Sequence, residues 1–216
     1  MLPVGTEVVL FDAGGVLLLP DWERVAAAIR GLGAPAEAAA LAVAAAEVPA
    51  AAGKNDRERW QAYVEAVYSA AAGSTLRPWI HPLYDQHMAE HFWSRPAPEA
   101  NAVLTRLRGA GLRLGVVSNS TGAVGAELVR AGLSHQFEHV LDSALEGVEK
   151  PDPVLFRRAL DRMGVVAART VFVGDTWDVD IEGARAVGMH TVFVSRRATS
   201  IRPSIQDLWP LVRDVP

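Results

Sequence analysis

Val8-Val-Leu-Phe-Asp12-Ala-Gly-Gly-Val16 begins as an apolar run and ends in an aspartate that two glycines follow closely. A short run of β-branched and large apolar residues is typical of a strand buried on both faces of a parallel sheet. Similar runs occupy 113–117 and 170–174, and polar residues follow each of them. Ligands of an open α/β sheet bind outside the carboxyl ends of its strands. We therefore expect these polar residues to meet at one sheet edge.

Strands and helices alternate from Pro96 onward. The pattern predicts strands at 113–117, 138–142, 170–174 and 190–194, separated or preceded by helices at 98–109, 121–131, 152–163 and 179–187. Strands separated by helices of about ten residues indicate parallel βαβ units with right-handed crossovers. The fold class is therefore α/β, with a Rossmann-like parallel sheet as its core.

This alternation is interrupted after the first strand. Residues 21–91 show helical patterns at 22–31, 36–48, 56–72 and 83–93, with Pro78 and Pro82 expected to break the chain before the last of them. The sequence thus predicts a core formed by 1–17 and 92–216 and an all-helical insert at 18–91. Two hinge strands, near Leu18-Leu19-Pro20 and Phe92-Trp93, are expected to join them.

Composition excludes several classes of protein. The 216 residues carry a formal net charge of −4, and the arginines are spread along the chain, so we expect neither a nucleic-acid nor a membrane partner. The absence of cysteine excludes disulfides and thiolate metal sites. No stretch reads as an export signal or a membrane span, which favours a cytoplasmic protein. A monomer and a homodimer are both compatible with the sequence.

Four polar motifs follow or lie beside the apolar runs: Asp12, Ser118-Asn119, Lys150-Pro-Asp-Pro and the acidic stretch Asp175-Thr-Trp-Asp-Val-Asp180. Each has a simple structural explanation when taken alone. An aspartate near glycine commonly forms a turn, Ser118 could cap the next helix, and a lysine before proline could be a surface charge. Lys150, however, is one of only two lysines in the chain.

The order and spacing of the four motifs resemble the haloacid dehalogenase-like (HAD) hydrolase superfamily over nearly the whole chain. The most specific part of the resemblance runs from Gly174-Asp175 to Gly188-Met189. The resemblance implies a catalytic core at 1–17 and 92–216. It also implies that 18–91 is a helical cap of the C1 type, which closes over the site and excludes water.

The resemblance also implies a role for each motif. Asp12 would be the nucleophile that forms an aspartyl-phosphate. Ser118 and Asn119 would bind phosphate oxygens, and the Lys150 ammonium would neutralise both the nucleophile and the transferred phosphoryl group. The implied substrate is a small phosphorylated metabolite.

A magnesium ion is the implied cofactor. Mg²⁺ prefers one or two carboxylates together with waters and substrate oxygens. Asp12, Asp175 and the Gly14 carbonyl are the expected direct ligands, and Asp180 would act through water or orient the loop. Asp178 is expected to be solvated.

Lys54, in Gly53-Lys-Asn-Asp56, lies in a stretch that resembles the substrate-specificity loop of the family. It is therefore a candidate for substrate binding. An exposed loop charge explains this lysine equally well.

Gly14 departs from the pattern of the family's phosphatases, which carry a second aspartate there as general acid and base. Such a group contributes about 10²–10⁴-fold in rate. Three explanations stay open: a phosphohydrolase of reduced or unusual efficiency, a dehalogenase, or a catalytically weak phosphate-binding module. A phosphonatase is a variant of the first. A dehalogenase needs no acid because halide leaves unprotonated, but the family's dehalogenases lack the full acidic motif that this chain retains.

Overall fold

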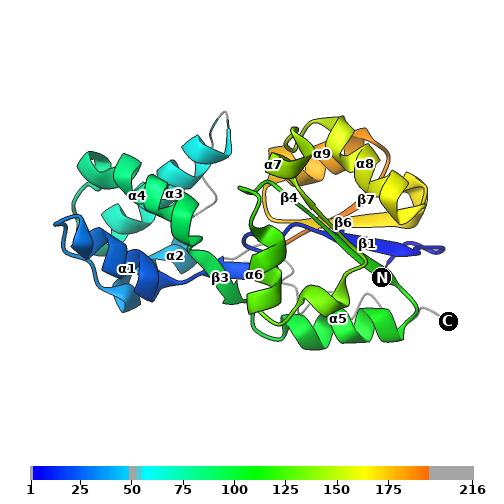
Figure 1. The fold of residues 1–216 in the computed structure, drawn as a ribbon, viewed down its shortest axis with the longest axis horizontal. Coiled ribbons are helices and arrows are strands. Elements are labelled where there is room, and N and C mark those ends of the chain that lie inside the picture. The colour runs from blue at the N-terminus through cyan, green and yellow to red at the C-terminus, as the bar shows by residue number, and fades with distance from the viewer. Residues whose placement is uncertain (1, 49–52, 54, 195–216) are drawn as a thin grey trace. The chain divides into compact units, whose positions relative to one another are not determined.

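The chain forms two compact units in the computed structural model, which describes residues 2–48, 53 and 55–194. Of the described residues, 2–19 and 94–194 form unit 1, and those between 20 and 93 form unit 2 (Figure 1). Within the described residues, no helix combines the length and the hydropathy that spanning a bilayer requires.

Unit 1 is built on a five-stranded parallel sheet with the strand order β5-β4-β1-β6-β7. Its strands are β1 (Val8–Phe11), β4 (Arg113–Ser118), β5 (His139–Asp142), β6 (Thr170–Gly174) and β7 (His190–Phe193). The α/β fold with a parallel core sheet, predicted from the sequence, is confirmed. The strands lie where the apolar runs predict them. β1 and β6 are buried along their whole length, which is why their sequences are continuously apolar.

Helices cover both faces of this sheet (Figure 1). Val9 and Phe11 of β1 pack in one apolar cluster with α5 (Ala100–Gly109) and α6 (Val124–Arg130). Val8 and Leu10 point to the opposite face, into a cluster with α8 (Pro153–Met163). This alternation is the two-residue period of a strand. Shorter elements complete the unit: α7 (Ser143–Glu146), α9 (Glu182–Ala186), the 3₁₀ turns η2 (Ser134–Gln136) and η3 (Ala167–Arg169), and the π-helical turn η4 (Trp177–Ile181).

Unit 2 is helical. Its elements are α1 (Trp22–Gly31), α2 (Ala38–Glu47), α3 (Asp56–Ala72), the 3₁₀ turn η1 (Arg77–Trp79) and α4 (Ile80–Glu90). Asn55 caps α3 by accepting the Glu58 N–H, and Gly73 ends it with a left-handed backbone. Tyr63 is buried in the core of this unit, and Trp22 and Trp60 pack against that core.

The two connections between the units pair with each other as β2 (Leu18–Pro20) and β3 (Trp93–Pro96). They lie close to the two hinge strands predicted near Leu18-Leu19-Pro20 and Phe92-Trp93. The predicted strand at Phe92-Trp93 starts one residue too early and ends three residues too soon.

Several predicted helices start one to three residues later than predicted, and two others depart further from the prediction. The helix predicted at 83–93 spans Ile80–Glu90, and Pro82 lies in its first turn instead of breaking the chain. N–H groups of a first helical turn have no acceptor within the helix, so proline costs little there. The helix predicted at 179–187 is divided into the π-helical turn η4 and the short helix α9.

Candidate active site

The carboxyl ends of three neighbouring strands bring the polar motifs of unit 1 together. β1 lies between β4 and β6, and its last residue, Phe11, is in register with Val116 and Val173. Asp12, Ser118 and Asp175 consequently leave the sheet at the same edge. This convergence follows from parallel pairing, because all strands of such a sheet end on the same side.

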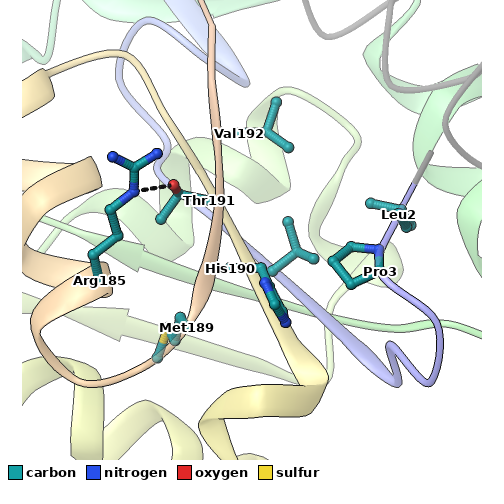
Figure 2. A pocket seen from close by; sticks show the side chains of 8 residues that line it. Leu2, Pro3, Arg185, Met189, His190, Thr191 and Val192 are labelled. Carbon is teal, nitrogen blue, oxygen red and sulfur yellow. Dashed lines mark hydrogen bonds between the residues drawn. The ribbon is translucent and has the colours of Figure 1, made fainter.

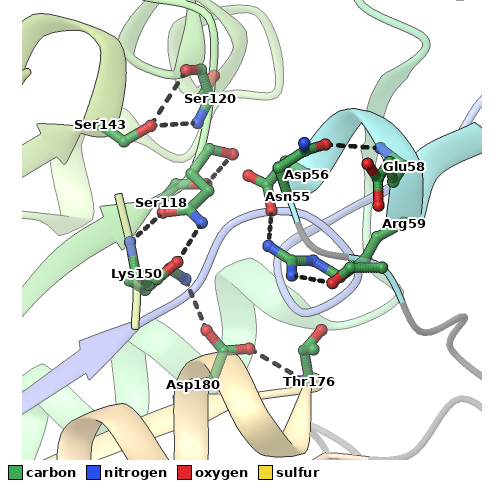
Figure 3. Close-up of polar contacts among 12 residues, drawn as sticks. Asn55, Asp56, Glu58, Arg59, Ser118, Ser120, Ser143, Lys150, Thr176 and Asp180 are labelled. Atoms are coloured by element: carbon green, nitrogen blue, oxygen red, sulfur yellow. Dashed lines mark hydrogen bonds and ion pairs between the residues drawn. The ribbon is translucent and has the colours of Figure 1, made fainter. Parts of the chain in front are cut away.

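Lys150 is the centre of the site. Its Nζ lies 2.9 Å from Asp12 Oδ1 and 2.7 Å from Asp180 Oδ1, and its side chain is 1% exposed. Figure 3 shows Lys150 directed at Asp180. The ammonium also lies 5.3 Å from the centroid of the Phe172 ring, a favourable position for a cation. Lys150 is therefore a buried charge paired with two carboxylates.

Asp12, Asp175 and Asp180 form a buried acidic cluster. Each of them offers a carboxylate oxygen, and the three oxygens all lie within 4.8 Å of one another. Oδ2 of Asp180 accepts the backbone N–H groups of Asp175 and Thr176, at 3.2 and 3.0 Å. Asp180 thus orients the loop that carries Asp175, while its other oxygen holds Lys150.

Gly174 permits this close packing. A Cβ at position 174 would lie 2.3 Å from the Cβ of Asp180, a distance that real side chains do not adopt. The glycine is therefore needed for the approach of Asp180 to the end of β6. A substitution here would displace the carboxylate that faces Lys150.

Burial and crowding change the proton affinities in the cluster. Burial raises the pKa of Asp12 to about 7, with help from Asp180 and Asp175, although Lys150 opposes the rise. The pKa of Asp180 is also raised, mainly by burial. Burial alone would lower the pKa of Lys150, but Asp12 and Asp180 outweigh it and the pKa is raised. The lysine is therefore charged, and it lies in a cluster that holds three carboxyl groups.

The loop after β1 is narrow. The Leu17 and Leu18 N–H groups donate to the Ala13 carbonyl, and the Gly15 N–H donates to the Leu18 carbonyl. None of these three hydrogen bonds uses the Gly14 carbonyl oxygen. Gly15 adopts φ +81°, a conformation that favours glycine, which places the conformational requirement of this loop at Gly15.

The two predicted phosphate-binding residues lie at the end of β4: Ser118 is its last residue, and Asn119 follows it. Ser118 is buried at the strand end, and the Asn119 side chain bonds to the main chain of Lys150, with Nδ2 2.9 Å from its carbonyl and Oδ1 2.7 Å from its nitrogen. The structure thus brings Asp12, Ser118 and Lys150 to one edge.

Two residues that hold the loop 118–124 in place by hydrogen bonds were not predicted from the sequence. Asp142, the last residue of β5, accepts the N–H groups of Gly122 and Val124. Ser143 bonds to the main chain of Ser120 (Figure 3). The signal available in the sequence was the aspartate that ends a fourth apolar run at 138–142.

The candidate residue Lys54 lies outside the described residues. Its neighbours in unit 2 are held by Arg59, whose guanidinium donates to the Gly53 carbonyl and forms an ion pair with Asp56 (Figure 3). The predicted substrate-binding role of Lys54 stays a prediction.

A pocket of about 310 Å³ lies elsewhere in unit 1 (Figure 2). Its lining comprises Leu2, Pro3, Val171, Arg185, Met189, His190, Thr191 and Val192. Val171 and His190 stand near the amino ends of β6 and β7, whereas the acidic cluster follows the carboxyl end of β6. The pocket is therefore not part of the candidate active site.

The fold and the site agree with the relationship found by sequence comparison. Residues 6–188 match the family model described as haloacid dehalogenase-like hydrolase. The chain belongs to this family of hydrolases, as its motifs indicate.

Curated relatives share about half of the chain. The sequence is 41% identical over 117 residues to a phosphoserine phosphatase of Thermus thermophilus, covering 54% of this chain and 46% of the relative. It is 39% identical over 111 residues to a glyceraldehyde 3-phosphate phosphatase of Methanopyrus kandleri, and this match covers 51% of this chain and 48% of the relative. The chain therefore spans about half the length of these curated relatives.

Solved structures extend the similarity to the whole chain. An L-2-haloacid dehalogenase is 26% identical, with a TM-score of 0.61, and the match covers 97% of this chain and 100% of the other. Phosphatases and dehalogenases thus both occur among the proteins that this chain resembles.

Proposed function

We propose that this protein is a Mg²⁺-dependent phosphohydrolase that acts on a small phosphorylated metabolite through an aspartyl-phosphate on Asp12. The observation that carries the proposal is the joint placement of Asp12, Lys150 and the acidic pair Asp175 and Asp180 at one sheet edge. A nucleophile, a buried cation and an excess of carboxylates are what phosphoryl transfer needs.

In the first step, a carboxylate oxygen of Asp12 attacks phosphorus. The new bond joins this oxygen to phosphorus, and the bond from phosphorus to the ester oxygen breaks. The Asp12 carboxylate is held in place by the Ala13 N–H at 2.8 Å and by Lys150. Lys150 also faces the charge that develops on the phosphoryl oxygens, which lowers the barrier.

In the second step, water attacks the phosphorus of the acyl-phosphate, and the bond to Asp12 breaks. Inorganic phosphate leaves and the carboxylate is restored. Gly14 has no side chain to donate a proton to the leaving group or to accept one from this water. We therefore expect fast turnover only for leaving groups that depart readily, unless a residue of unit 2 supplies the proton.

The acidic cluster fits a magnesium ion, because three buried carboxyl groups offer oxygen atoms within 4.8 Å of one another, and oxygen is the ligand that Mg²⁺ prefers. Asp12, Asp175 and the Gly14 carbonyl would hold the ion, and Asp180 would orient their loop while it holds Lys150. When bound, the ion neutralises the charge on the phosphate and on the nucleophile.

Residues 1–17 and 92–216 are proposed as the catalytic core and 18–91 as the cap that selects the substrate, with Lys54 as a candidate contact. The names of the curated relatives make phosphoserine and glyceraldehyde 3-phosphate the first substrates to test.

A haloacid dehalogenase is the second candidate. Gly14 favours it, because halide leaves without a proton, and so does the similarity to a solved L-2-haloacid dehalogenase. The buried acidic cluster opposes it, since a halide-releasing site has no use for an excess of carboxylates.

A substrate panel separates the two. Purified protein is assayed for phosphate release from phosphoserine, glyceraldehyde 3-phosphate, nitrophenyl phosphate and a phosphonate, and for halide release from 2-haloacids, each with Mg²⁺ and with a chelator. We expect Mg²⁺-dependent phosphate release that Asp12→Asn eliminates. Halide release that persists in the chelator, without phosphate release, would replace the proposal by the dehalogenase.

A further inference from the structure

Two side chains hold the start of the loop 118–124 through paired hydrogen bonds. The Asn119 amide donates from Nδ2 to the Lys150 carbonyl and accepts the Lys150 N–H at Oδ1. The Ser143 hydroxyl accepts the Ser120 N–H at 3.1 Å and donates to the Ser120 carbonyl at 3.2 Å (Figure 3). Each side chain therefore satisfies both main-chain groups of a residue far away in the sequence.

The main chain next to Lys150 is held by a turn, in which Asp152 N–H donates to the Glu149 carbonyl at 3.0 Å, and by α8, which begins at Pro153. The N–H and the carbonyl of Lys150 itself bond to Asn119. Lys150-Pro-Asp-Pro belongs to no strand of the sheet, and prolines 151 and 153 cannot donate a backbone hydrogen bond. Asn119 supplies in this place the two bonds that a neighbouring strand would supply in a sheet. Its own main chain directly follows β4, so it anchors Lys150 to the sheet.

The position of the Lys150 main chain sets that of its ammonium. The stem is buried, and Nζ fits between Asp12 and Asp180, 2.9 and 2.7 Å from their oxygens. A shift of the main chain by one ångström would lengthen both ion pairs. Displacements of this size in an active site typically reduce rates by about 10²-fold.

We infer that Asn119 is a positioning residue, which fixes Lys150 between Asp12 and Asp180 rather than contacting the substrate. This assignment differs from the substrate-binding role that its place in the sequence predicts. The catalytic part of the inference rests on the proposed function, whereas the placement of Lys150 does not.

The first test observes the lysine directly. The sequence contains two lysines, Lys54 and Lys150, so ¹⁵N labelling of lysine side chains gives two ammonium signals, which Lys54→Met assigns. In Asn119→Ala we expect the Lys150 signal to shift and its proton exchange to become about tenfold faster, because the displaced ammonium is held less well by Asp12 and Asp180. The Lys54 signal serves as the internal reference.

Asn101→Ala is the matched control, because it removes another asparagine from unit 1 whose side chain bonds elsewhere, to Gln136 at 2.7 Å. Its Lys150 signal should equal that of the unchanged protein. Asn119→Ser, which is too short to reach Lys150, replaces Asn119→Ala if the alanine variant does not fold. A folded variant at position 119 with an unchanged Lys150 signal would overturn the inference.

The second test is a double-mutant cycle on phosphate release. If Asn119 acts through Lys150, Asn119→Ala should lower kcat about 10²-fold alone and only slightly in a Lys150→Met background. Equal losses in both backgrounds would mean that Asn119 acts on the substrate independently, and would refute the inference. If no phosphate is released by any variant, the proposed function fails while the lysine signals still decide the placement.

Discussion

The two units bury titratable groups in opposite ways. In unit 2, His87 stacks on Trp60 with ring centroids 4.7 Å apart and accepts the Phe92 N–H. Burial, and to a lesser extent His91, lowers the pKa of His87 to about 3, so the imidazole is neutral at ordinary pH. In unit 1, Lys150 stays charged between Asp12 and Asp180.

The neutral His87 is typical of a residue that serves packing, whereas the charged Lys150 is typical of a functional site. A buried histidine that gives up its charge serves as one more aromatic ring in an apolar core, at little electrostatic cost. A group of buried charges with an excess of one sign opposes folding, and such arrangements are concentrated at functional sites. Four substitutions or titrations test this contrast.

Asp12→Asn should have the largest effect, the loss of all hydrolysis, because an amide cannot form the acyl-phosphate. The same variant should be more stable than the unchanged protein in metal-free solution at pH 8. The pKa of Asp12 is higher in the folded protein, at about 7, than its ordinary value of 3.8, so the cost of ionising it grows between these values and is complete above pH 7. Removing this cost should stabilise by on the order of 2 kcal/mol.

Phosphate release and thermal melting at pH 4 and pH 8 measure both effects. Asp178→Asn is the control, since Asp178 is exposed in the same acidic stretch. A destabilised Asp12→Asn at pH 8 would contradict the view that the site is strained by its own charge.

Gly14→Asp adds a carboxyl group to the charged edge. It should raise the rate on alkyl phosphates by up to about 10²–10⁴-fold, because it supplies the missing general acid. Nitrophenyl phosphate should respond little, since its leaving group needs no proton. The positive φ of this loop lies at Gly15, which the substitution leaves unchanged.

Gly14→Asn is the matched control for this gain, as it has the same shape but no proton to exchange. Folding of both variants is checked by melting before rates are compared. Equal rates for the two variants on alkyl phosphates would show that an acid at this position is not what limits turnover.

Magnesium affinity should depend on pH. Below pH 7 a proton occupies Asp12, and the ion must displace it, so the apparent affinity should fall about tenfold per pH unit. Above pH 7 it should be constant. Calorimetric titrations between pH 5.5 and 8.5, in steps of about one unit, test this expectation, and an affinity that is flat across that range would exclude Asp12 as a ligand.

His87→Gln should have the smallest effect, on the pH dependence of stability alone. The histidine takes up a proton on unfolding between pH 3 and about 6.5, so the free energy of unfolding rises with pH in this interval, by at most about 1.4 kcal/mol per unit. Glutamine can still accept the Phe92 N–H but does not titrate, and the slope should decrease. His81→Gln, at an exposed position, should leave it unchanged.

Much of unit 1 could be predicted from local patterns. The apolar runs at 113–117 and 170–174 became β4 and β6 within one residue, because a strand buried on both faces requires such a run wherever it lies. The polar residues after the runs identified Asp12, Ser118, Lys150 and the acidic stretch as one set. Parallel pairing implied that Asp12, Ser118 and Asp175 share an edge, whereas the resemblance to the family added Lys150.

Helix boundaries were less accessible. Pro82 was expected to precede a helix and lies inside its first turn, since the cost of proline depends on a position within the helix that composition does not reveal. The π-helical turn at Trp177–Ile181 likewise has no local signature in the sequence. It arises where Asp180 must reach the main chain of Asp175 and Thr176.

By itself, the sequence determined which residues are candidates for the active site, because motifs and apolar runs can be recognised from residues that are close together along the chain. Only the tertiary structure decided what each of them contacts. The partner of Asn119 is 31 residues away, and that of Ser143 is 23 residues away. Such contacts depend on which strands lie side by side, and the strand order β5-β4-β1-β6-β7 is set by the packing of the whole core.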